Sequence, residues 1–129
     1  MLQHFHPRHI PALIAGSTMA LGGLWPIFNA PAAMLEFGLP ARIANTPAAA
    51  PVMVVGTVRT TIIGVLILVF YSRRQMDVVD TFLAVTGGYA GLVDSYVVWR
   101  EGSPSQAVFR LVSSWLIGAW GVFGMTAGR

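Results

Sequence analysis

Residues 52–70 have the sequence VMVVGTVRTTIIGVLILVF, an apolar run long enough for a membrane-spanning helix and broken by a single charge, Arg59. A spanning helix needs about 20 mostly apolar residues. Three further stretches of similar length and character follow the same pattern. The four predicted spans are Ile10–Phe28, Val52–Phe70, Val78–Trp99 and Ala107–Met125. Together with short connections they fill the chain, which leaves no room for a separate water-soluble domain.

The composition supports this interpretation. The chain has 129 residues, of which 55% are hydrophobic and only 10% charged, whereas soluble domains carry about 25% charged residues. We therefore expect one transmembrane domain over residues 1–129, an all-α four-helix bundle. The first apolar run is long for the core of a signal peptide, so we expect it to be retained.

The connection between the first two predicted spans has a different character. It contains Pro31, Pro40, Pro47 and Pro51, and its segment Ala32–Gly38 is short and amphipathic. A segment of this length does not span a bilayer. We expect an interfacial or re-entrant turn, because irregular backbone is tolerated at membrane depth only where protein or water covers it.

The distribution of arginine predicts the orientation. The net charge of +3 comes from arginine, since the chain has no lysine. Arg8, the Arg73-Arg74 turn and Arg129 fall on one side of the predicted bundle, and Arg42 and Arg100 on the other. The excess of positive charge predicts an integral, multi-pass protein with both termini in the cytoplasm. The sequence does not indicate an organelle.

Several partner and cofactor classes are not indicated. The arginines are scattered, so we expect no nucleic-acid partner. The absence of cysteine excludes disulfides and thiolate ligands. We predict no cofactor and no metal. His4, His6 and His9 are of a type that can bind a metal, but interfacial roles on a short polar arm are favoured.

Charged residues inside the predicted spans are the best indication of function, since an intramembrane ion usually has a partner or a task. At about 1.5 Å of rise per residue, Arg59, Asp94 and Arg110 lie about 10, 7 and 9 Å inside their helices, all in the same half of the bilayer. Glu36 belongs to the connection on that side. We therefore expect two acids and two arginines to converge.

The predicted chemistry is acid–base catalysis. Two carboxyl groups in different environments can act as a general base and a general acid. Asp94, beside Arg59, is the predicted base and Glu36 the predicted acid. Arg110 is predicted to hold a carboxylate, carbonyl or enolate of the substrate. Aromatic residues are predicted to line the pocket for a lipophilic small molecule: Tyr89, Tyr96, Trp115 and Trp25.

Structural alternatives stay open at this point. Arg59 and Asp94 could form a buried ion pair that only fixes helix packing, and Arg110 could extend to the interface. The aromatic residues could form an interfacial belt. A non-catalytic subunit or a small carrier in the lipid bilayer is then the alternative function. A pore would require several copies of so small a chain, which would make the protein a homo-oligomer.

The segments Gly56-Thr-Val-Arg59, Ile63-Gly64 and Gly91-Leu-Val-Asp94 resemble those of small four-helix membrane proteins of fungi and bacteria, a domain of unknown function distantly similar to DoxX-type bundles. The resemblance covers about residues 50–125 and implies the architecture first. Some fungal members resemble tailoring proteins of natural-product pathways, which implies an enzyme in biosynthesis. The acid–base chemistry predicted above then favours an isomerase or cyclase. Arg59 and Asp94 are the positions that carry over, whereas Glu36 and Arg110 rest on the depth argument.

Overall fold

The structure is a computed structural model that describes residues 5–128, and within this range the chain is helical with no strand. The elements are, in order, η2 (Pro7–His9), α1 (Ile10–Gly22), α2 (Trp25–Phe37), α3 (Ala41–Ala44), α4 (Ala49–Ser72), α5 (Met76–Val85), η3 (Thr86–Ala90), α6 (Gly91–Glu101) and α7 (Pro104–Val122). The all-α prediction is confirmed.

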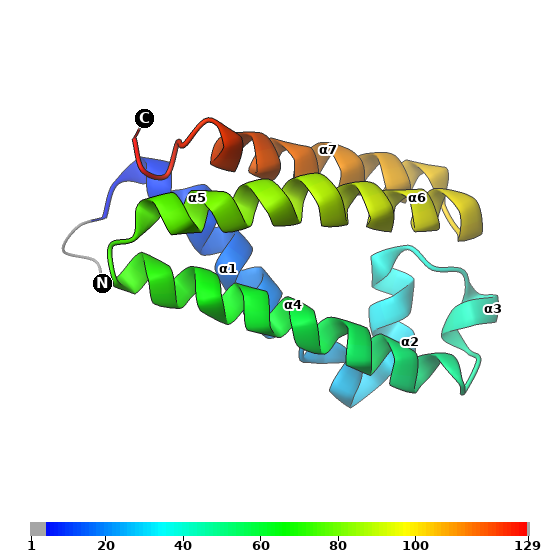
Figure 1. Ribbon diagram of the computed structural model, residues 1–129. Coiled ribbons are helices and arrows are strands. Elements are labelled where there is room, and N and C mark those ends of the chain that lie inside the picture. Colours follow the sequence, from blue (N-terminus) through cyan, green and yellow to red (C-terminus); the bar gives the residue numbers. More distant parts are fainter. Residues whose placement is uncertain (1–4, 129) are drawn as a thin grey trace.

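Two helices are long and apolar enough to cross a membrane. One is α4, and the other is the continuous helix Met76–Glu101, which comprises α5, the π-helical turn η3 and α6. They contain the predicted second and third spans. The tight turn at Arg73–Gln75 makes them antiparallel, and α7 runs back along α5 and α6 (Figure 1). Such helices indicate a membrane protein.

The first predicted span differs from a straight helix. Helix α1 ends at Gly22, and the chain bends by 104° before α2. Pro26 lies in the first turn of α2 and has no N–H to donate back to α1, so the helix cannot continue. The segment η2–α1 and helix α2 are long and apolar enough for a span only when taken together as a bent pair.

The short segment predicted at Ala32–Gly38 is the second half of a longer helix, α2. This helix begins at Trp25 and kinks at Asn29, whose φ of −154° and ψ of 82° are not helical. The Asn29 side chain accepts a hydrogen bond from the Ala32 amide at 3.2 Å, so it caps the second half of the helix. Pro31 follows the kink, where its missing N–H costs little.

Helix α7 is 19 residues long but is not one of the two helices that are both long and apolar enough to span. It carries Arg110, Ser113, Ser114 and Gln106 among its apolar residues. The predicted fourth span therefore corresponds to a helix that is long enough but more polar than α4.

Small residues allow α1 and α4 to pack closely. A Cβ atom on Gly64 would collide with the backbone nitrogen of Ala20 and lie 2.7 Å from the Gly16 carbonyl oxygen. A Cβ on Gly23 would lie 2.7 Å from the Thr57 carbonyl oxygen. The small residues Gly16, Ala20 and Gly23, spaced three or four apart in the sequence, thus allow this close approach. Such contacts replace the hydrophobic driving force that is missing between helices in lipid.

A second set of small residues joins α7 to the helix Met76–Glu101. Gly87 of η3 packs against Gly118, because a Cβ on Gly87 would meet the Ser114 carbonyl and lie 2.5 Å from the Gly118 nitrogen. Gly91 faces Ser114 in the same way, while Gly88 faces open space. Gly87 and Gly91 therefore let α7 pack closely against this helix.

Polar contacts join the turn after α7 to α5 and to the segment before α1. The buried Asp80 carboxylate accepts hydrogen bonds from the Thr126 and Ala127 amides at 3.1 and 2.9 Å. Arg8 donates to the Thr126 carbonyl at 3.3 Å. From the sequence, Asp80 is expected in the first turn of its helix, where an acid caps the free amides. Instead it lies fifth in α5, past the first turn, and binds the C-terminal turn.

Substitution of Gly64 by Ala is predicted to separate α1 from α4. The new methyl group meets backbone atoms that cannot move independently, and such overpacking costs about 1–3 kcal/mol of unfolding free energy. Gly56→Ala in the same helix is the matched control, because a Cβ there meets nothing within 4 Å. Unfolding in mixed micelles measures both. Equal stability of the two variants would contradict the packing described here.

Substitution of Asp80 by Asn is predicted to release the C-terminal turn. The amide NH2 group of Asn would face a backbone N–H that now donates to a carboxylate oxygen, so one of the two hydrogen bonds is lost. Hydrogen exchange at Thr126 and Ala127 should then become faster, while exchange in α4 stays unchanged. The Asp77→Asn variant, which removes a neighbouring exposed charge, should leave exchange at both amides as in the wild type.

Candidate functional site

Arg110 is the centre of the group of charged residues that the sequence predicted. It lies on α7 and is half-buried. Its Nε donates a hydrogen bond of 2.6 Å to the carbonyl oxygen of Phe37 at the end of α2. Its guanidinium carbon lies 3.8 Å from the centre of the Phe37 ring, a cation–π contact. Arg110 therefore joins α7 to α2.

The end of α2 is shaped to receive this arginine. Gly38 has a φ of 115°, a left-handed conformation that favours glycine. The amides of Gly38 and Leu39 donate back to Leu35 and Met34 at 3.1 and 3.0 Å, which closes the helix in a Schellman motif. Because the last carbonyls of a helix carry partial negative charge, a guanidinium is favourable at the Phe37 oxygen.

Both predicted acids lie near Arg110. Asp94 on α6 is half-buried and within electrostatic range of Arg110, and so is Glu36, which is exposed in the last turn of α2. Neither forms a direct ion pair with Arg110 in the described range 5–128, where the ion pair found joins Arg42 to Glu101. The hydroxyl of the buried Ser95, next to Asp94, has no hydrogen-bond partner there. Three of the four predicted ions thus converge.

Arg59 does not join them. It is exposed, and its Nη1 donates to the Val55 carbonyl of its own helix at 2.9 Å. The predicted pairing of Arg59 with Asp94 is not formed. At about 100° of rotation per residue, Arg59 points about 140° away from Gly64, which marks the face of α4 that packs on α1. The sequence predicted a similar depth for Arg59 and Asp94, but it did not indicate the direction in which Arg59 points around its helix.

The predicted aromatic residues do not enclose a shared pocket. Tyr89 is 73% exposed, and Tyr96, Trp115 and Trp25 are exposed as well. The Tyr96 hydroxyl accepts a hydrogen bond from Arg100 at 3.2 Å. The Trp115 indole donates to the Gly88 carbonyl in the π-helical turn at 3.3 Å. These positions suit the surface of a membrane protein, where aromatic side chains contact lipid.

Two shallow hollows lie elsewhere on the surface. One, of about 350 Å³, follows α1 along Ile10, Leu13 and Ile14. The other, of about 180 Å³, lies between η3 and α7, beside Gly88 and Trp115. Neither hollow is lined by Arg110, Asp94 or Glu36.

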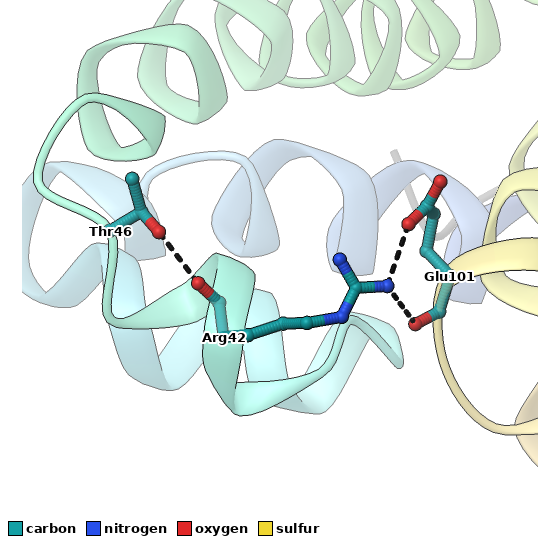
Figure 2. Close-up of polar contacts among 3 residues, drawn as sticks. All are labelled: Arg42, Thr46 and Glu101. Carbon is teal, nitrogen blue, oxygen red and sulfur yellow. Dashed lines mark hydrogen bonds and ion pairs between the residues drawn. The ribbon is translucent and has the colours of Figure 1, made fainter.

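A second contact, between α3 and the end of α6, lies at the same end of the molecule as Arg110, Asp94 and Glu36. Arg42 of α3 donates to the Glu101 carboxylate at 2.8 Å and to the Glu101 carbonyl at 3.2 Å, while Thr46 donates to the Arg42 carbonyl (Figure 2). A Cβ on Gly102 would collide with the Gly38 carbonyl oxygen. The turn after α6 is therefore pressed against the turn after α2.

Sequence reasoning missed Phe37 and the Arg42–Glu101 pair. The signal for Phe37 was the glycine that follows it, because glycine just beyond an amphipathic segment marks a helix end with unpaired carbonyls. The Arg42–Glu101 pair is 59 residues apart in the chain and had no sequence signal.

The histidines contribute to packing. His9 is buried, and its Nδ1 lies 2.9 Å from the Tyr71 hydroxyl. His4 lies outside the described residues. Within the described part of the chain, three or more His, Asp or Glu side chains do not gather in a way that could hold a metal ion.

The comparisons with known proteins identify a family. Residues 16–124 match the family model described as "Domain of unknown function (DUF4267)". No curated protein and no solved structure matches the chain. The predicted membership in a domain-of-unknown-function family is thus confirmed. The family description assigns no activity.

Substitution of Arg110 by Gln is predicted to detach α2 from α7. A hydrogen bond that involves a charged group contributes about 1.5–3 kcal/mol, and the stacking on Phe37 is lost as well. The unfolding free energy in mixed micelles should fall by roughly that amount. Arg59→Gln, which removes a charge bound only to its own helix, should change it far less. A loss as large in Arg59→Gln would contradict this role of Arg110.

Proposed function

The chain belongs to the DUF4267 family, and for this member we propose a small intramembrane enzyme that isomerises or cyclises a lipophilic molecule by acid–base chemistry. The observation that carries the proposal is that Asp94 of α6 and Glu36 of α2, which are far apart in sequence, both lie within electrostatic range of one arginine, Arg110. Charged groups are costly in apolar helices, so their gathering favours a functional role over chance.

The proposed membrane arrangement has four passes, with α1 and α2 as a broken span and α7 as the fourth. Three observations support it: α7 packs antiparallel to the helix Met76–Glu101, Arg73 and Arg74 lie at one end of the bundle, and Arg42 and Arg100 lie at the other. The positive-inside rule then places both termini in the cytoplasm. The paired α2 and α3 cover the opposite end.

The proposed chemistry uses each ion in one role. Asp94 removes a proton from a carbon next to a carbonyl of the substrate. Arg110 stabilises the resulting enolate through Nη1 and Nη2, since its Nε is already bound to Phe37. Glu36 returns a proton at a different carbon, which completes an isomerisation. Exchange with water then restores both carboxyl groups, so no other reactant is needed.

One observation favours a second candidate, a non-catalytic membrane subunit or small carrier whose ions fix helix packing. The hydrogen bond from Arg110 to Phe37 is short and satisfies a helix-terminal carbonyl. This contact would be useful even without any substrate. The two functions differ in what the loss of Asp94 does.

Isotope labelling tests the proposal for a substrate that is still unidentified. Purified protein in lipid vesicles is incubated in D2O with a lipophilic extract of the organism that encodes it, and the extract is analysed by mass spectrometry. Proton transfer at carbon through Asp94 and Glu36 introduces deuterium from the solvent. We expect at least one compound to gain deuterium with the wild type and with Arg59→Gln, and none with Asp94→Asn.

The thermal stability of Asp94→Asn is measured beside the labelling. A folded variant of near wild-type stability that no longer labels supports catalysis. Labelling by Asp94→Asn at the wild-type rate contradicts the proposal, and so does the absence of labelled compounds with the wild type. A large loss of stability in Asp94→Asn together with no wild-type labelling favours the structural subunit.

A further inference from the structure

The outer face of α4 is largely uncovered. It runs the length of the helix and consists of Val52, Val55, Gly56, Arg59, Ile62 and Val69, all exposed. In the most apolar part of α4 only 11% of the residues are buried within the molecule. In a bilayer this face contacts lipid or another protein, and every residue of it except Arg59 suits lipid.

Arg59 lies well inside α4. It lies about 15 Å from the start of α4 at Ala49 and about 20 Å from its end at Ser72, at 1.5 Å of rise per residue. Charged residues at such depth usually face the interior of a bundle or pair with another group. Arg59 points outward, and its side chain donates a hydrogen bond to the Val55 carbonyl.

The chain's own acids are engaged elsewhere. Glu101 pairs with Arg42, and Asp80 binds the C-terminal amides. Asp94 and Glu36 lie in the field of Arg110. Asp77 lies in the first turn of α5, next to the turn that joins α4 to α5, whereas Arg59 lies nearer the start of α4. The guanidinium of Arg59 is thus left without a carboxylate partner among residues 5–128.

Gly56 makes close approach to this face easy. It lies about one turn before Arg59, and a Cβ placed on it meets nothing within 4 Å. The glycine is therefore not needed for packing inside the molecule. On an outer face, a missing side chain lets the backbone of a partner helix come near, as small residues do between membrane helices.

We propose that the outer face of α4 binds a transmembrane helix of another protein, one that presents a carboxyl side chain at the depth of Arg59. Charge complementarity decides this choice of occupant. A second copy of the chain is disfavoured, because a two-fold contact between α4 faces would bring the two Arg59 side chains together. The proposal is independent of the chemistry at Asp94.

Energy transfer in vesicles of neutral lipid tests the proposal. The chain has no cysteine, so Gln75→Cys, in the exposed turn after α4, accepts a single donor dye. The probes are Leu/Ala helices of about 20 residues, labelled with an acceptor dye and carrying one central Glu or, as a control, one central Gln. We expect the Glu helix to bind about tenfold more tightly than the Gln helix.

Variants of the chain then identify the face. Arg59→Gln should reduce binding of the Glu helix to the level of the Gln helix, and Gly56→Leu should weaken binding with the charge intact. Arg73→Gln, which removes an equal charge from the turn, should bind as the wild type does. Equal binding of both helices, or wild-type binding by Arg59→Gln, would overturn the proposal. Energy transfer between two labelled chains that Arg59→Gln abolishes would assign the face to a second copy instead.

Discussion

The hydrogen bond from the Arg110 side chain to the Phe37 carbonyl is the contact on which the arrangement around the charged residues depends. Helix α2 leaves the bundle after a bend of 104°, and its other contacts are its packing on α4 and the contact between its C-terminal turn and the turn after α6. By binding the last carbonyl of α2, Arg110 fixes that end to α7. The same contact keeps Glu36, the residue before Phe37, in the field of Arg110, which Asp94 also influences.

This contact also explains why a structural and a catalytic role are compatible here. An arginine has five donors in a rigid fork, and Phe37 uses one of them. In the proposed reaction the Nη atoms of Arg110 bind the substrate, while the Nε bond and the Phe37 ring fix the orientation of the guanidinium. Preorganised donors of this kind stabilise developing negative charge without reorganisation during the reaction.

Hydropathy predicted the helical class and the two long spans because both depend on apolar runs that are visible in one dimension. Depth along the helices predicted Asp94 and Arg110 at one level, with Glu36 in the connection on the same side, and both acids lie within electrostatic range of Arg110. The same argument wrongly placed Arg59 in this group. Apolar residues occur all around α4, so the sequence does not show which side of that helix faces the bundle. The bend before α2 was missed because Trp25-Pro26 is equally typical of the interfacial end of a span and of a break within the membrane-embedded part.

The distance between α2 and α7 tests the central claim most directly. Spin labels at Leu35→Cys and Phe109→Cys, both exposed positions, report that distance by double electron–electron resonance in lipid vesicles. The account predicts a single narrow distribution that becomes broad when Arg110→Gln is added to the labelled chain. A broad distribution before that change, or a narrow one that persists after it, would show that Arg110 does not hold α2 in place.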